Sequence, residues 1–124
     1  MAMSSDQLEI LDEVNTVVVE TRSGGRTIGT IIWVVVDDGE VFVRSVRGES
    51  GRWYQRALAD PEVTLRVGDD RPRFRAVPAD DAASVERVSQ ALRRKYPPGG
   101  SLDRMLRPEV LGTTLHLEPL DPLT

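Results

Sequence analysis

Residues 44–54 (RSVRGESGRWY) concentrate side chains that bind phosphate in other proteins. Three arginines stand there against one glutamate, with two serines and two glycines. Arginine forms paired hydrogen bonds with an anion, serine donates another, and glycine lets the backbone approach closely. Together with Arg56, four arginines against Glu49 give a local excess of positive charge in a chain whose net charge is −4. The stretch therefore indicates a site for a small anionic ligand, unless these arginines pair with Glu49, Asp60 or Glu62 in a solvated loop.

Other kinds of chemistry are excluded by the residues that the sequence lacks. There is no cysteine, which excludes disulfides, thiol catalysis, iron–sulfur clusters and thiolate zinc sites. His116 is the only histidine, and it cannot alone supply the imidazoles of most catalytic metal sites. We therefore predict no catalytic side-chain dyad and no metal site. The acidic pI of about 5.0 also argues against nucleic acid as a general partner.

The composition predicts one soluble domain, residues 1–124. The chain is 40% hydrophobic and 29% charged, as in ordinary globular proteins. The longest apolar run, residues 31–36, is too short to span a bilayer, and residues 1–15 lack the features of a signal peptide. We therefore expect a cytoplasmic protein with no membrane partner.

The elements that would position the arginines are mostly strands. Residues 1–15 form a helix or arm, because Leu8, Leu11 and Val14 recur at helical spacing behind a cap at Ser4 or Ser5. The predicted strands are 16–22, 27–36, 40–46, 62–67, 71–78 and 112–118. Predicted helices follow at 52–59, from a cap at Asp80 to Pro97, and in a short turn after Ser101.

This order predicts a mostly β fold with inserted helices (α+β). Six strands joined by tight hairpins favour a small, mostly antiparallel barrel over residues 16–118. Residues 31–36 are apolar on both faces, so we expect the outer face to be covered by a helix or by a second copy of the chain. A homodimer is the natural cover.

Part of the sequence resembles the FMN-binding split β-barrel superfamily, which includes pyridoxamine 5′-phosphate oxidase-like proteins and deazaflavin-dependent nitroreductases. The likeness lies in residues 27–45 (TIGTIIWVVVDDGEVFVRS), Gly48, the Arg-Trp-Tyr of 52–54 and residues 58–65 (LADPEVTL). Within the superfamily, residues 44–54 are most similar to a family of small proteins known as domain of unknown function 2255. The resemblance spans residues 16–118 and implies a six-stranded antiparallel split β-barrel that dimerises.

The resemblance also implies a small oxidoreductase with FMN or a deazaflavin of the coenzyme F-420 type at each of two sites in a dimer interface. Hydride transfer would then belong to the cofactor. The ring would lie along the main chain of Thr30, Ile31, Ile32 and Trp33. The phosphate or ribityl tail would be held by Arg44, Ser45, Gly48, Arg52 and Trp53, with Arg47 of the arginine-rich stretch beside them.

Two features depart from the superfamily pattern, and they keep alternatives open. Ile32 stands where many members have a proline before the strand aromatic, here Trp33, and no lysine lies near the expected phosphate. One alternative is a cofactor-free dimer with an interaction or structural role, in which Arg44 and Arg52 pair with acidic neighbours. Another is a haem or bilin binder, for which His116 is the only possible imidazole ligand.

A second group of arginines lies on the strands at 62–67 and 71–78. Arg66, Arg73 and Arg75 are expected to share one face of this hairpin. A solvated face is the simpler interpretation. The alternative is that these arginines receive the acidic tail of a deazaflavin.

Overall fold

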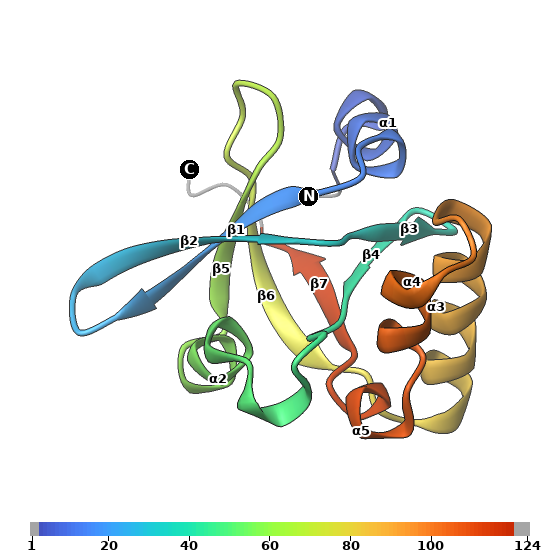
Figure 1. Cartoon of the computed structure of the whole chain (residues 1–124). Coiled ribbons are helices and arrows are strands. Elements are labelled where there is room, and N and C mark those ends of the chain that lie inside the picture. The colour runs from blue at the N-terminus through green and yellow to red at the C-terminus, as the bar shows by residue number, and fades with distance from the viewer. Residues whose placement is uncertain (1–2, 121–124) are drawn as a thin grey trace.

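The structure, a computed structural model, describes residues 3–120 and is built on one seven-stranded antiparallel sheet (Figure 1). The strand order is β2-β1-β5-β6-β7-β4-β3. The strands are β1 (Val17–Ser23), β2 (Arg26–Ile32), β3 (Val35–Asp37), β4 (Glu40–Val43), β5 (Glu62–Arg66), β6 (Arg73–Pro78) and β7 (Leu115–Pro119). The helices are α1 (Ser5–Glu13), α2 (Arg52–Ala59), α3 (Ala82–Lys95), α4 (Gly100–Met105) and α5 (Pro108–Leu111), with a short 3₁₀ turn at Gly48–Ser50.

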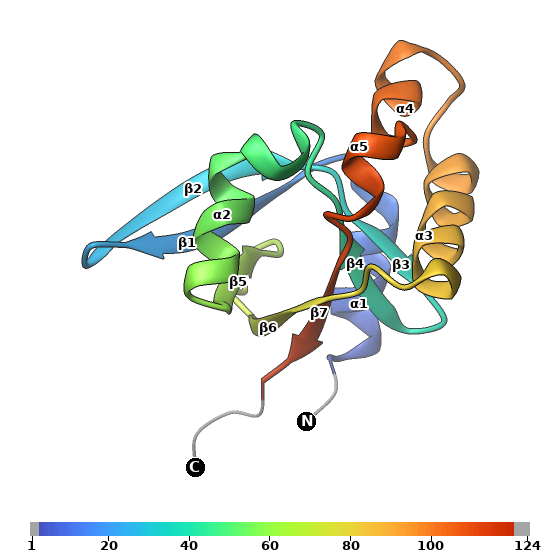
Figure 2. The same ribbon diagram turned by 90° about the horizontal axis from the view of Figure 1, so that it is seen from below.

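The sheet curls into a half-barrel. Its two edge strands, β2 and β3, are separated in the chain only by Trp33 and Val34, so the edges must approach each other at this point. Figure 2 shows the strands wrapping around a common centre, with α2 on one side and α3 on the other. The α+β class and the antiparallel curl that the sequence predicts are therefore confirmed.

The prediction of six strands is wrong, because the expected strand 27–36 is divided. β2 pairs with β1, whereas β3 pairs with β4 on the other edge of the sheet. Between them, Val34 bonds to side chains from the end of α3: its N–H donates to the Tyr96 hydroxyl (3.3 Å) and its carbonyl accepts from Lys95 Nζ (2.6 Å). Because these side chains satisfy its backbone groups, the chain can leave one strand partner and join another at Val34.

The hairpins agree with the turn residues. Gly24 and Gly25 both have positive φ (56° and 77°), as do Asp38 and Gly39 (50° and 75°), which is the two-residue turn that matches strand twist. In the first hairpin Ser23 pairs with Arg26, and Val17 pairs with Ile32.

Most helix predictions are also confirmed, with shifts at their ends. The Ser4 hydroxyl accepts from Gln7 N–H (3.2 Å) and caps α1. α3 is capped by Asp81, not Asp80, because it is the Asp81 carboxylate that accepts from Ser84 N–H (3.1 Å). Helix α5 was not predicted, and it occupies part of the loop before β7.

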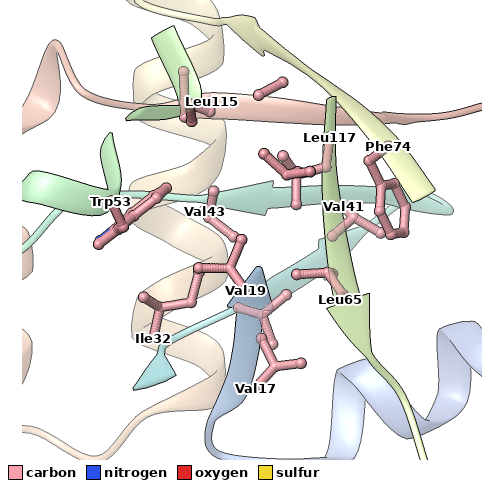
Figure 3. Close-up of a cluster of buried hydrophobic side chains, with 14 of the residues drawn as sticks. Val17, Val19, Ile32, Val41, Val43, Trp53, Leu65, Phe74, Leu115 and Leu117 are labelled. Atoms are coloured by element: carbon pink, nitrogen blue, oxygen red, sulfur yellow. The ribbon is translucent and has the colours of Figure 1, made fainter. Parts of the chain in front are cut away.

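Two apolar cores explain the helix positions. The first fills the barrel, where Val19, Leu65, Phe74 and Leu117 converge from different strands (Figure 3). The second lies between the outer face of β3–β4 and helices α3 and α4, and its members are Val35, Phe42, Ala79, Val88, Ala91, Leu92, Tyr96, Leu102 and Met105. Burial of these side chains on each face supplies the main driving force for the fold.

The second core also changes the expected dimer surface. The outer face of residues 33–36 is covered largely by this chain's own helices, as the packing of Trp33 and Val35 against the second core shows. Ile31 remains uncovered, with 71% of its surface exposed. No helix within residues 3–120 is both long and apolar enough to cross a membrane.

Candidate functional site

A cavity of about 710 Å³ opens where the end of β2, the loop after β4, the start of α2 and helix α4 meet. Nine of the ten residues predicted for the site line it. They are Thr30, Ile31, Ile32, Trp33, Arg44, Ser45, Arg47, Arg52 and Trp53; only Gly48 does not. The fold thus brings the two predicted segments, 30–33 and 44–53, to one place.

Arg44 lines the cavity with a buried side chain, 2% exposed, that is tied to the interior. Its Nε donates to Thr114 Oγ1 (2.8 Å), Nη1 donates to Ser89 Oγ (3.1 Å) and to the Met105 carbonyl (3.0 Å), and Nη2 donates to the Val85 carbonyl (3.1 Å). Burial lowers the pKa of Arg44 to about 10.

Arg44 therefore fastens the chain after β4 to α3, to α4 and to Thr114, the residue before β7. Four of its five N–H groups are already used, so the expected direct hold on a phosphate does not match its environment. None of its acceptors is a carboxylate, and within residues 3–120 it forms no salt bridge. Its positive charge is thus not neutralised by the protein and contributes to the potential of the cavity.

Ser45 and the two glycines of the loop are also explained by packing. Ser45 Oγ donates to the Gly48 carbonyl (2.8 Å), and Ser45 N–H donates to Thr113 Oγ1 (3.1 Å). Gly48 has φ of +64°, and a Cβ there would lie 3.0 Å from the Glu109 carbonyl oxygen. At Gly51 a Cβ would lie 2.3 Å from Ser45 Oγ. The close approach that these glycines permit is between parts of the chain itself.

The remaining cavity arginines have the opposite environment. Arg47, Arg52 and Arg104 are exposed, and within residues 3–120 they make no side-chain hydrogen bond or salt bridge. Arg56 donates to two neutral hydroxyls, Thr21 Oγ1 (2.7 Å) and Thr30 Oγ1 (3.4 Å). Among residues 3–120, no aspartate or glutamate lines the cavity. Five arginines without a carboxylate make the cavity strongly attractive to anions.

The start of α2 adds to this preference. Arg52 is the first residue of the helix, the capping residue Gly51 offers no side chain, and no acidic residue lies in the first turn. A helix N-terminus carries partial positive charge, so a cation there is unfavourable unless an anion lies nearby. The environment of Arg52 thus favours a bound anion.

Other residues lining the cavity are apolar. Ile31 is exposed, Ile32 is buried, and Trp33 is partly buried with its indole stacked on the Tyr96 ring (centroids 3.7 Å apart, planes 6° apart). Trp53 is also buried, edge-on to Tyr54 at 6.3 Å. The cavity lining therefore combines aromatic and aliphatic side chains with cationic ones, which suits a ligand with a flat ring and an anionic tail.

The other candidate residues lie elsewhere. His116 Nε2 is 3.2 Å from Glu40 Oε2, its ring lies 5.0 Å from that of Phe42, and it does not line the cavity. Arg66 pairs with Glu20 (3.0 Å) and Arg73 with Glu62 (3.3 Å), so each of these arginines already has a carboxylate partner.

Sequence reasoning missed the contribution of α4, which brings Ser101, Arg104 and Met105 to the cavity. These residues lie about half the chain away from the arginine-rich stretch. Their only sequence signal was a short helical turn after Ser101, which says nothing about which strand the helix covers. The position of α4 depends on the second core, to which Leu102, Met105 and Phe42 all belong.

Comparison with known proteins places this geometry in context. The profile of a protein family described as "Uncharacterized protein conserved in bacteria (DUF2255)" matches residues 7–117. No curated protein matches the chain.

Solved structures share the fold at low sequence identity. A candidate pyridoxamine 5′-phosphate oxidase from Listeria innocua superposes with a TM-score of 0.67 at 16% identity, over 92% of this chain and 90% of that one. An FAD binding protein from Mycobacterium smegmatis gives 0.66 at 16% identity, over 98% and 93%. The haem storage protein HutZ from Vibrio cholerae gives 0.65 at 17% identity, also over 98% and 93%. At these identities the likeness establishes the fold, which this chain shares with proteins of several functions.

Proposed function

This chain belongs to the family of uncharacterised bacterial proteins DUF2255, and we propose that it binds FMN or a deazaflavin in the cavity between β2, α2 and α4 and acts as a small oxidoreductase. The observation that carries the proposal is the composition of the cavity. Within residues 3–120 its lining combines five arginines and no carboxylate with apolar side chains that include Trp33. Flavin-type cofactors combine a flat ring with an anionic tail, which matches both kinds of lining residue.

The residues present fit such a group in size and in chemistry. A volume of about 710 Å³ is within the range of sites that hold small organic ligands. The end of β2 and Trp33 would lie along the ring and exclude water from it. Arg47, Arg52 and Arg104 have N–H groups free within residues 3–120 to bind the phosphate. Arg44 acts indirectly, by holding the end of β4 in place.

When bound, the cofactor would accept and return a hydride, and the protein would contribute orientation, dryness and charge near the ring. In the part of the chain that the structure describes, no histidine, cysteine or carboxylate lines the cavity to serve as an acid, base or nucleophile. Such a lining does not suit a hydrolase, which needs these groups, but it suits a flavin site, where the cofactor carries the chemistry.

We further propose that a second copy of the chain completes the site. Ile31 is 71% exposed and Val46 is 46% exposed, and both border the cavity. Their burial against a partner would remove apolar surface from water and close the apolar side of the cavity. Light scattering during size-exclusion chromatography should give twice the mass of the 13.8 kDa chain. An Ile31→Glu variant should give the mass of one chain, and a monomeric wild-type protein would contradict the dimer.

The binding proposal is tested by titrating the purified protein separately with FMN and with an F-420-type deazaflavin, followed by absorbance and fluorescence. We expect at least one to bind with a dissociation constant in the micromolar range. Arg52→Gln should weaken that binding about tenfold, because a charge-assisted hydrogen bond is lost. Arg93→Gln removes the same charge from an exposed position on α3 that does not line this cavity, and should leave binding unchanged.

Binding of neither cofactor at tens of micromolar would contradict the proposal and would favour the cofactor-free dimer. That alternative expected Arg44 and Arg52 to pair with acidic neighbours, and within residues 3–120 neither does. A haem or bilin would need an axial ligand. His116 faces Glu40 and lies outside the cavity lining, so a haem in the cavity would be without an imidazole ligand from the same chain.

A further inference from the structure

A second hollow lies beside the cavity, between the β1–β2 turn and α2. It is a groove of about 750 Å³, lined on one side by residues 22–25 and on the other by residues of α2 with Asp60. Arg52 and Arg56 line both the groove and the cavity. The two hollows are therefore neighbours separated by these two side chains, and Figure 2 shows α2 alongside the β1–β2 hairpin that forms the far wall.

The positive charge of the cavity arginines is larger than the negative charge of one phosphate group. None of the five arginines has a carboxylate partner within residues 3–120: the buried Arg44, and Arg47, Arg52, Arg56 and Arg104. A phosphate monoester carries about −1.5 to −2 charges at neutral pH. Even without the buried Arg44, roughly two positive charges would thus remain uncompensated after one phosphate had bound. Arg52 and Arg56 face the groove as well.

The environment of Arg56 points the same way. It is partly buried against β1 and β2 by its bonds to Thr21 and Thr30, both of which are neutral. An immobilised arginine without a carboxylate partner leaves guanidinium N–H groups and a full charge for a ligand. Arg22 extends the row to the β1–β2 turn. Unlike the cavity arginines it is ion-paired, with Glu62, but this one carboxylate also pairs with Arg73 and cannot neutralise both arginines.

We propose that the groove is a second anion subsite, and that the cofactor is of the class whose tail carries further phosphate or carboxylate groups beyond the first phosphate. The tail would run from the cavity over Arg52 and Arg56 to Arg22. This inference rests on the proposed function and specifies its ligand. The single carboxylate of the groove, Asp60, would oppose the tail, and its side chain makes no hydrogen bond or salt bridge within residues 3–120.

The test compares three probes by direct binding: FMN, with one phosphate; FAD, with two adjacent phosphates; and an F-420-type deazaflavin, with a carboxylate-bearing tail. We expect FAD or the deazaflavin to bind more tightly than FMN, and its affinity to fall more steeply as salt is added, because more charges are engaged. Which of the two binds more tightly identifies whether the groove takes phosphate or carboxylate.

Two groove variants should act in opposite directions. Arg22→Gln should weaken binding of the favoured long-tailed probe about threefold, and Asp60→Asn should strengthen it by a similar factor, as expected for partly exposed charges. Both should leave FMN binding unchanged. Glu62 also pairs with Arg73 (3.3 Å), so in the Arg22→Gln variant the Glu62 carboxylate still has a cationic partner.

Each groove variant has a control variant with the same charge change at a residue that lines neither the groove nor the cavity. Arg93→Gln and Asp69→Asn alter exposed residues that line neither of them, and should change no affinity. Equal affinity of all three probes, or long-tailed binding that ignores both groove variants, would overturn the subsite while leaving the proposed function intact. Binding of none of the probes would overturn both.

Discussion

Arg44 and Arg52 come from the same short stretch of sequence and border the same cavity, yet their environments are opposite. The Arg44 side chain is 2% exposed and donates four hydrogen bonds to hydroxyl and carbonyl oxygens. Arg52 is exposed and has no side-chain partner within residues 3–120. The first holds elements of the fold together, whereas the second is available to a ligand.

The difference teaches that a cluster of arginines is not by itself a binding site. Arginine has five donors in a fixed plane, so one buried guanidinium can join several chain segments at once. Arg44 joins α3, α4 and the residue before β7 in this way. Because its acceptors are neutral, the charge remains, and one residue can both support the fold and favour an anion nearby.

The largest effect should come from truncating the buried arginine. Arg44→Ala leaves a cavity and removes the partner of Thr114, Ser89 and two carbonyls, so we expect the free energy of unfolding to fall by about 3 to 5 kcal/mol. Urea denaturation followed by circular dichroism measures it. The matched control is Arg52→Ala, which should cost no more than about 0.5 kcal/mol. Equal losses for the two variants would remove the contrast between them.

A smaller effect should follow from Gly51→Ala, next to the helix that carries Arg52. The backbone conformation of Gly51 (φ −62°, ψ 125°) suits any residue, but the new Cβ would lie 2.3 Å from Ser45 Oγ. We expect a loss of about 1 to 3 kcal/mol in the free energy of unfolding. Gly112→Ala is the control, because it has open space and an ordinary φ of −70°, and should be nearly neutral.

A double variant tests the assigned cause. If the clash with Ser45 is responsible, Gly51→Ala combined with Ser45→Ala should be less destabilised than the sum of the two single changes. Simple additivity would show that the loop tolerates the methyl group without moving Ser45, and that its packing is looser than the structure indicates.

The location of the residues at the cavity could be predicted from the sequence better than the role of each side chain. Turn glycines and alternating strands specify the hairpins, and the hairpins bring residues 30–33 and 44–53 together, so nine of the ten predicted residues line the cavity. Whether an arginine side chain is buried depends on acceptors far away in the chain, such as Thr114 for Arg44. A local sequence pattern does not show which distant residues will supply these acceptors.

The same limit explains the other differences. The break between β2 and β3 depends on Lys95 and Tyr96, which lie about 60 residues further along the chain. Arg104 reaches the cavity because Leu102 and Met105 anchor α4 in the second core. Each is decided by long-range packing, whereas residues 31–36 read alone are one continuous apolar strand.

Lys95 is intermediate between the buried and the exposed arginines, and should make stability depend on pH. Its Nζ donates to the carbonyls of Leu11 (2.8 Å) and Val34 (2.6 Å), and burial lowers its pKa from 10.5 to about 8. Between these values the unfolded chain binds more protons than the folded one. The free energy of unfolding should therefore rise as the pH increases from about 8 to 9.5, by on the order of 1 to 2 kcal/mol.

Urea midpoints at about pH 7, 8 and 9.5 measure this slope, and Lys95→Met should abolish it. Higher pH is avoided because burial raises the pKa of Tyr54 and of Tyr96, so that above about pH 10 ionisation of the tyrosines in the unfolded chain lowers stability. A wild-type slope that persists in Lys95→Met would assign it to another group and would show that Lys95 behaves as an exposed cation.

The smallest effect on stability should come from the cavity arginine that only the structure revealed. Arg104→Gln removes an exposed side chain with no partner in residues 3–120, so the free energy of unfolding without ligand should change by less than about 0.5 kcal/mol. A slight gain is the expected sign, because the variant relieves repulsion among the cavity arginines. A loss above about 1 kcal/mol would place Arg104 with Arg44 as a structural residue.

With cofactor present, the Arg104→Gln variant should instead be less stable than the wild type. A ligand at about 100 times its dissociation constant stabilises the folded state by about 2.7 kcal/mol. Arg104→Gln weakens that binding, so at the same ligand concentration the variant should show a smaller rise in unfolding temperature than the wild type. Arg93→Gln should keep the full rise. An arginine whose loss leaves the stability of the ligand-free protein unchanged, but reduces the rise in unfolding temperature caused by the ligand, binds that ligand. Arg44 differs, because its loss destabilises the protein even without ligand.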